Sequence, residues 1–201
     1  RKKSHPDLVA PYTGPASILN VPISGQRRFA IYACPIERMK ALGKAGGGTI
    51  NDAVLAVCSG ALRKYLMDLN ALPDKALVAN MPVSIRPKDS DEAGNAITFM
   101  MATLASHIED PKTRFDLITA STAAAKEHLQ AMDTAAINNY TMLLMAPFTV
   151  GQLTGLTSFK HPMYNVVISN VPGPKKPLYF NGARLEGVFP VSLMPNGQAL
   201  N

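Results

Sequence analysis

Residues 46–66, GGGTINDAVLAVCSGALRKYL, constrain the fold more than any other stretch because they predict a long amphipathic helix. Three glycines end the preceding unit, and Thr49 followed by Asp52 three residues later has the pattern of a capping box. Apolar side chains then recur at helical spacing, which predicts that one face of the helix packs on a core. The predicted core face consists of Ile50, Val54, Val57, Cys58, Ala61, Leu62 and Tyr65.

Strand-like segments alternate with helical ones along the chain. Each is an apolar run rich in β-branched or aromatic residues and bounded by turn residues. The predicted strands are residues 27–36, 76–86, 96–108, 163–169 and 183–193. Alternation of strands and helices is typical of α/β folds, in which helices cover a sheet. We therefore predict an α/β fold with a mixed sheet and flanking helices.

Three further segments predict helices. Residues 35–45 and 110–130 each begin with a proline in the first turn, where the missing N–H costs nothing. Residues 134–159 carry no charge, but Asn, Gln, Thr and Pro147 interrupt them, and the apolar runs fall short of the roughly 18 residues of a membrane span. We expect two buried or partly interfacial helices there, broken at Pro147.

Charge and cysteine content limit the class of partner and compartment. Twenty Lys and Arg against fourteen Asp and Glu give a net charge of +6, which favours an anionic partner. Nucleic acid is disfavoured, since the chain has no Trp and no basic stripe interleaved with aromatic residues. Cys34 and Cys58 lack the spacing of a disulfide framework or a metal site, so we interpret both as buried thiols of a reducing, cytoplasmic compartment.

The first residues predict a linker. Residues 1–26 contain four prolines and two glycines, which excludes a long helix or a central strand. We predict a crossover linker over 1–26 and a single domain over 27–201. Because the chain starts without Met, we expect it to be part of a longer polypeptide.

Four blocks of sequence carry a family resemblance when they are taken together and in order. They are GGTINDAVLAVCSGALRKYL, MPVSIRP, EHLQ with NYTMLLMAPF, and YNVVISNVPGPKKPLYFNGARLEGVFPVSLMPNGQALN. With these blocks the chain resembles the bacterial wax ester synthase/acyl-CoA:diacylglycerol acyltransferase family over essentially its whole length. The Asn-Asp pair at 51–52 and the Asn-Val-Pro-Gly-Pro turn at 170–174 are signatures of that family.

The resemblance implies a fold and a missing motif. The family is similar to chloramphenicol acetyltransferase and the CoA-dependent acyltransferase superfamily, with two α/β domains and a tunnel between them. This chain corresponds to the linker and most of the second domain. None of its four histidines, His5, His107, His128 and His161, stands in the family motif HHxxxDG, whose second His is the base. The resemblance therefore places the base in the N-terminal half of the same enzyme.

The resemblance also implies a reaction. The family forms wax esters from acyl-CoA and long-chain fatty alcohols, and triacylglycerol when diacylglycerol is the acceptor, in lipid storage. Acyl-CoA is a substrate, so no cofactor is implied. The ten methionines and the low fraction of charged residues, 17%, suit an apolar tunnel, because Met packs adaptably. The implied location is cytoplasmic, with contact to the inner membrane or to lipid droplets as an option.

Candidate site residues follow from the same signatures. The resemblance implies that Asn51 supports catalysis by hydrogen bonding and that Asp52 lies in the substrate-binding region; capping a helix is the alternative role for both. Ser169 and Asn170 end a predicted strand, where ligand sites of α/β sheets gather. We expect one of these two to hold the thioester carbonyl or a neighbouring backbone group.

The turn after this strand is the last candidate. Pro172 and Pro174 stiffen it and Gly173 admits a close backbone or ligand, so we expect it to shape the tunnel wall. Lys175 and Lys176 are candidates for contact with CoA phosphates, with a solvated loop as the alternative. Arg86 has the same two interpretations.

Two other functions remain open at this point. One is a non-catalytic module that binds lipid or acyl-CoA. The other is a condensation-type transferase that takes thioesters from a carrier protein. An HHxxxDG motif upstream favours the enzyme, and its absence favours the binding module.

Overall fold

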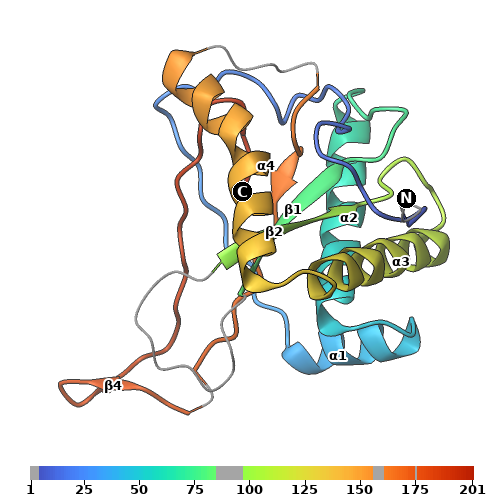
Figure 1. Cartoon of the computed structure of the whole chain (residues 1–201). Helices are drawn as coiled ribbons and strands as arrows, with labels where there is room; N and C mark the ends of the chain where they lie inside the picture. Colours follow the sequence, from blue (N-terminus) through green and yellow to red (C-terminus); the bar gives the residue numbers. More distant parts are fainter. Residues whose placement is uncertain (1–4, 85–96, 156–160, 175) are drawn as a thin grey trace.

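The computed structural model describes residues 5–84, 97–155, 161–174 and 176–201. In these ranges the chain forms a three-stranded mixed sheet with helices on both faces, as Figure 1 shows. The helices are α1 (Ile36–Ala45), α2 (Ile50–Asp68), α3 (Pro111–Gln130) and α4 (Thr134–Thr154). The strands are β1 (Val78–Ser84), β2 (Ile97–Thr103), β3 (Val166–Val167), β4 (Tyr179–Phe180) and β5 (Ala183–Arg184). The predicted α/β class with a mixed sheet is confirmed.

The central strand of the sheet is β1, in the order β2-β1-β3. It pairs with β2 antiparallel along its full length, from Val78 opposite Thr103 to Ser84 opposite Ile97. It pairs with β3 in parallel, but only Ala79 and Asn80 have partners there. One edge of β1 is therefore covered throughout, and the carboxyl-terminal part of its other edge is not covered by β3.

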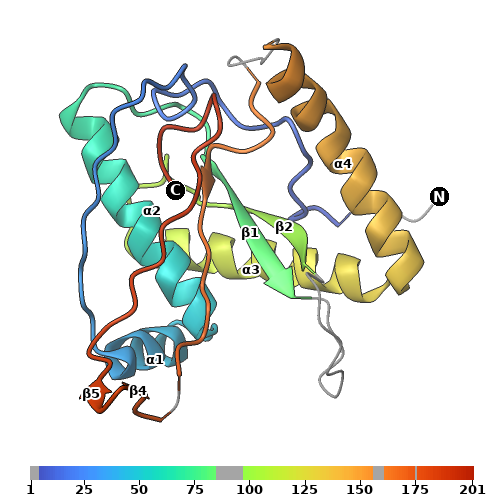
Figure 2. The same ribbon diagram turned by 90° about the vertical axis from the view of Figure 1, so that its left-hand side faces the viewer.

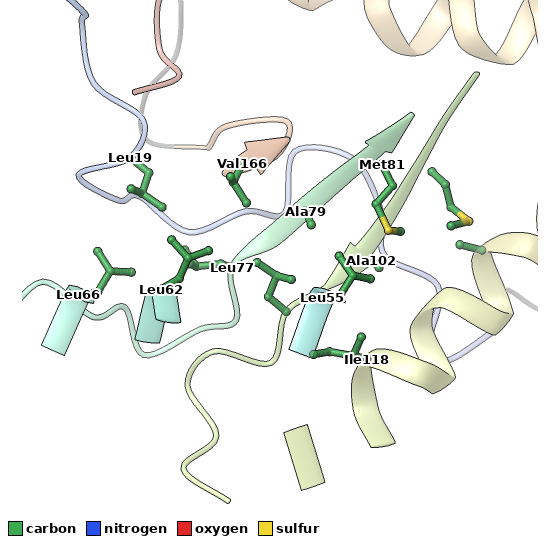
Figure 3. Packing of buried hydrophobic residues seen from close by; sticks show 13 residues of the cluster. Leu19, Leu55, Leu62, Leu66, Leu77, Ala79, Met81, Ala102, Ile118 and Val166 are labelled. Carbon is green, nitrogen blue, oxygen red and sulfur yellow. The ribbon is translucent and has the colours of Figure 1, made fainter. Parts of the chain in front are cut away.

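Two hydrophobic layers enclose this sheet. Helices α2 and α3 cover one face and α4 covers the other, as the turned view in Figure 2 shows. The larger layer joins leucines of α2 to Ile118 of α3 and to alternate residues of the strands (Figure 3). The buried members of this larger cluster are Leu19, Leu55, Leu62, Leu66, Leu77, Ala79, Met81, Met100, Ala102, Leu104, Ile118, Ala125 and Val166. The smaller cluster under α4 consists of Val78, Met101, Leu144, Met163 and Tyr164.

Helix α2 begins as the sequence predicts, but of the predicted core residues only Leu62 is buried. The capping box at Thr49 and Asp52 is present. The side chains of Val57 and Tyr65, predicted to be in the core, are 45% and 52% exposed. Ser59 is fully buried instead, and its hydroxyl donates to the carbonyl of Leu104 at 2.5 Å. A hydrogen-bonded serine can face the core, so hydrophobic periodicity alone assigned the wrong face.

Helix α4 runs through Pro147, which corrects the prediction of two helices. The proline cannot donate to the carbonyl four residues earlier. However, Leu144 before it and Phe148 after it both pack in the cluster under α4, which holds the two halves in line. Pro147 itself is exposed. Tertiary packing therefore outweighs the local helix-breaking effect.

Three predicted strands are shorter or missing. Residues 27–34 are predominantly exposed and pair with no strand of the described chain, and 163–169 contribute only Val166–Val167. Of 183–193, only Ala183–Arg184 forms a strand. A strand needs a hydrogen-bonded neighbour, and an apolar pattern does not supply one. The hairpin of β4 and β5 projects away from the three-stranded sheet, as Figure 1 shows.

One hairpin was not predicted although its signal is present. Strands β4 and β5 pair antiparallel across Asn181 and Gly182, which have φ angles of 47° and 82°. An Asn-Gly pair with two positive φ angles is the preferred two-residue hairpin turn. The confirmed elements are helices α1 and α3 and strands β1 and β2. Cys34 and Cys58 are half-buried free thiols rather than buried ones.

The edge of the sheet at β3 is held by a buried asparagine. Asn165 is fully buried, and its carbonyl oxygen accepts from the N–H of Val78 at 2.9 Å. Its amide nitrogen donates to the carbonyl of Pro15 at 2.8 Å and to the side chain of Asn20 at 2.7 Å. Asn20 in turn donates to the carbonyl of Gly197 at 3.0 Å. Part of the predicted linker and the C-terminal segment are thereby tied to the sheet.

We expect Asn165→Ala to lower the free energy of unfolding by about 2–4 kcal/mol, because it leaves several buried polar groups without partners. Urea denaturation of the protein would measure this loss. The matched control is Asn139→Ala on the exposed surface of α4, which should stay within about 0.5 kcal/mol of the parent protein. Equal effects of the two variants would contradict a structural role for the Asn165 network.

Candidate functional site

A small hollow lies where the carboxyl ends of β1 and β3 meet the first turn of α2. Its volume is about 40 Å³. Apolar side chains from three elements form its lining, and two asparagines stand among them. The lining residues are Asn51, Val54, Leu55, Met81, Pro82, Val83, Met100, Ile168 and Asn170. The hollow therefore combines an apolar lining with two amide groups.

Pro82 accounts for the opening of the sheet at this point. The N–H of Ile168 donates to the carbonyl of Asn80 at 3.0 Å, which is the last backbone bond between β1 and the chain after β3. In a regular parallel ladder the next bond would run from the N–H of residue 82 to the carbonyl of Ile168. Proline has no N–H, so the ladder stops. The chain is then free to turn away from β1 at Ser169 and Asn170.

The structure brings together two of the predicted site residues. The amide nitrogen of Asn170 donates to the side-chain oxygen of Asn51 at 2.5 Å, although 119 positions separate them in the sequence. Both side chains lie at the exposed rim of the hollow. Sequence patterns predicted the two residues separately, and the fold places them in contact.

Asp52 is placed elsewhere, in the anchor of α2. It is 2% exposed, and one carboxylate oxygen accepts from the N–H and the hydroxyl of Thr49, both at 2.7 Å. The other oxygen accepts from the hydroxyl of Thr122 on α3 at 2.6 Å. This geometry fits the capping alternative. The substrate-binding role of Asp52 stays a prediction.

The remaining candidates lie beside the hollow rather than in its lining. Ser169, Pro172, Gly173 and Pro174 are all exposed on the segment that leaves β3. Lys176 is exposed in the same segment. Arg86 and Lys175 lie outside the described residues. The Pro-Gly-Pro turn thus follows the hollow along the chain.

The prediction missed the apolar lining of the hollow. Val54 and Leu55 follow Asn51 by one helical turn, and Met81 and Met100 come from paired strands. The sequence signal for an opening at this place was Pro82, since a proline within the predicted strand 76–86 marks a point where the backbone hydrogen bonds of a sheet stop.

A larger hollow, of about 240 Å³, lies between α4 and the C-terminal segment. It is lined by Tyr12, Phe148, His161 and Tyr164, among others, and by none of the predicted site residues. Burial raises the pKa of the Tyr164 phenol, and hydrogen bonds from Gln198 and Asn80 partly offset that rise. The small hollow is therefore the candidate site, although the larger one offers more room.

Comparison with known families decides the membership of the chain. The profile of the WS/DGAT C-terminal domain matches residues 93–201, and that of the wax ester synthase/diacylglycerol acyltransferase catalytic domain matches residues 1–54. The chain belongs to the wax ester synthase/diacylglycerol acyltransferase family. The predicted boundary between a linker at 1–26 and a domain at 27–201 stays a prediction.

Relatives in this WS/DGAT family share nearly half of the residues. A probable diacylglycerol O-acyltransferase of Mycobacterium tuberculosis is 45% identical over 195 residues, which are 96% of this chain and 43% of the relative. The O-acyltransferase WSD of Acinetobacter baylyi is 45% identical over 197 residues, 98% of this chain and 43% of the relative. The chain thus spans less than half the length of these curated relatives.

A solved WS/DGAT structure has the same fold. The wax ester synthase/diacylglycerol acyltransferase from Marinobacter aquaeolei VT8 superposes with a TM-score of 0.74 at 41% identity. The superposition covers 87% of this chain and 39% of that protein.

Metal-binding clusters and membrane-spanning helices are the remaining features relevant to function. Among the described residues, no three His, Cys, Asp or Glu side chains gather as a metal site would require. In the same part of the chain, no helix has the length and apolarity needed to span a bilayer. The four histidines are all described, and none lines the small hollow.

We expect Asp52→Ala to destabilise the protein by about 2–3 kcal/mol, because the helix cap and the bond to Thr122 are both lost. Thermal or urea unfolding measures this change. A capping role also predicts that the activity per folded molecule stays near that of the parent. A large loss of that activity at unchanged stability would instead support a substrate-binding role for Asp52.

Proposed function

We propose that this chain is the C-terminal half of an O-acyltransferase that esterifies long-chain fatty alcohols with acyl-CoA to give wax esters. Diacylglycerol is the second acceptor, which gives triacylglycerol. Membership in the WS/DGAT family supports this proposal, as do the names of relatives that are 45% identical. Acyl-CoA, the alcohol and diacylglycerol are substrates, and the mechanism invokes no cofactor.

The observation that carries the proposal is the contact between Asn51 and Asn170 at the rim of an apolar hollow. Acyl transfer needs a hydrogen-bond donor for the oxygen of the thioester carbonyl, which gains negative charge in the transition state. Asn51 uses its oxygen to accept from Asn170, so its own N–H groups remain available as donors. Apolar neighbours such as Val54 and Met81 strengthen such a bond, because they lower the local dielectric.

The chemical step itself needs a base, which we expect in the N-terminal half of the complete enzyme. A histidine there would take the proton of the alcohol hydroxyl as the oxygen attacks the thioester carbon. The C–S bond then breaks, and the sulfur of CoA leaves with the proton from the imidazolium. In this scheme Asn51 supports catalysis, while proton transfer belongs to the other half of the enzyme.

Several finer features belong to the same proposal. The two halves would form the two α/β domains of a chloramphenicol-acetyltransferase-like fold, with the small hollow facing the tunnel between them. Lys176, exposed after the Pro-Gly-Pro turn, is available to CoA phosphates, and Lys175 adjoins it in the sequence. Pro172, Gly173 and Pro174 would shape the tunnel wall.

The proposed location is the cytoplasm, with peripheral contact to a membrane or lipid droplet. The exposed face of α4 supports such a contact. This helix of 21 residues carries no charge, and the side chains of Met142, Leu143 and Leu153 are 70%, 78% and 83% exposed. Exposed apolar side chains gathered on one surface are a feature of sites that contact membranes or other proteins.

Activity of the full-length protein tests the proposal. When the full-length protein is given palmitoyl-CoA, it should release free CoA after hexadecanol is added and only a little free CoA without hexadecanol. Alcohol-dependent release supports the acyltransferase. A folded protein that releases no CoA with hexadecanol or diacylglycerol would point to an acyl-CoA-binding module or to a transferase that uses carrier-protein thioesters.

Asn51→Ala in the full-length protein should lower kcat about a hundredfold, the usual order of loss for one oxyanion donor. Its melting temperature should change little, because the side chain is exposed and the cap belongs to Thr49 and Asp52. Steady-state CoA release and thermal unfolding together measure the two effects. Unfolding of the variant at unchanged activity per folded molecule would reduce Asn51 to a structural residue.

A further inference from the structure

We propose that Asn170 is a positioning residue that sets the orientation of the Asn51 amide. Its side-chain N–H holds the oxygen of Asn51 and thereby turns the N–H groups of Asn51 toward the reacting carbonyl. This inference rests on the proposed acyltransferase function and deepens it. It assigns Asn170 a role through Asn51 rather than a direct contact with substrate.

An asparagine amide has two sides that differ in hydrogen bonding. One side is an acceptor and the other carries two donors, so the partner of one side decides what the other side offers. Asn170 donates to Asn51, and the oxygen of Asn51 is therefore turned away from any ligand. Among the described residues, the amide nitrogen of Asn51 makes no hydrogen bond of its own. It remains a donor for a ligand at the rim of the hollow.

Rigid anchors hold the backbones on both sides of this bond. Asn51 lies in the first turn of α2, between Thr49 and Asp52 of the capping box. Asn170 follows Ile168, whose N–H is bonded to Asn80 and whose side chain packs on the main core. The two amides are thus left with side-chain rotation alone, and their mutual hydrogen bond restricts that rotation. Such support is what keeps a catalytic group within a productive geometry.

The opposite orientation would be harmful to acyl transfer. An Asn51 amide turned by 180° would present its oxygen, with its partial negative charge, to the developing oxyanion. The stabilisation from a donor would then be replaced by repulsion. Asn170 opposes this turn, because its N–H donates to the Asn51 oxygen at 2.5 Å and the turned amide would lose that bond.

Asn170→Asp is the decisive variant, because a carboxylate can only accept. It would bond to the amide nitrogen of Asn51 and reverse the Asn51 side chain without removing it. In the full-length enzyme with palmitoyl-CoA and hexadecanol, we expect kcat to fall at least tenfold with little change in KM. Gln130→Glu, the same change of amide to carboxylate at the exposed end of α3, is the matched control and should leave kcat unchanged.

A double-mutant cycle separates positioning from direct contact. If Asn170 acts through Asn51, Asn51→Ala combined with Asn170→Asp should be no slower than Asn51→Ala alone. Asn51→Asp should also be slow, although it keeps an acceptor for Asn170, because it lacks the donor N–H. Melting temperatures of all variants show whether any loss of kcat reflects unfolding.

The outcomes separate the positioning role of Asn170 from the acyltransferase activity of the enzyme. An active parent enzyme with an unaffected Asn170→Asp variant overturns the positioning role and leaves the acyltransferase intact. Additive losses in the double variant overturn it too, since they show that Asn170 acts independently of Asn51. If the parent protein releases no CoA with either acceptor, the proposed function fails, and this inference fails with it.

Discussion

The hydrogen bonds of the buried Asn165 side chain are the interactions on which the arrangement of the sheet edge and the candidate site depends. They connect the start of β1 to residues 15–20 and, through Asn20, to the C-terminal segment. Both polar atoms of the Asn165 side chain are shielded from water. If one of the connected segments were out of place, buried polar groups would lose their hydrogen bonds, which costs free energy. In this way one side chain places β3 along the edge of β1.

The position of β3 then determines the candidate site. Two residues of β1 are enough to hold β3 in parallel register, and Pro82 ends the ladder immediately afterwards. The chain turns away there, and Asn170 meets Asn51 in the first turn of α2. An apolar hollow with paired amides is therefore a direct result of where the sheet stops pairing.

The two faces of the sheet differ in what they offer to other molecules. On the side of α2 and α3, leucines and alanines fill a closed core, and the hollow opens only at its end. On the other side, α4 buries few of its own side chains and exposes large apolar ones. In the proposed enzyme, the first side would carry the reaction and the exposed apolar surface of α4 would meet lipid.

The sequence by itself determined the α/β class and the starts of α1, α2 and α3, because capping and periodicity are local signals. The candidates Asn51 and Asn170 came from the resemblance of two short motifs to the family signatures. The sequence did not determine which face of α2 is buried, the continuity of α4 through Pro147, or the lengths of the outer strands. These depend on partners distant in the chain. Only the tertiary structure decided that Asn51 and Asn170 touch, because a contact across 119 positions is set by the packing of whole elements and leaves no local pattern.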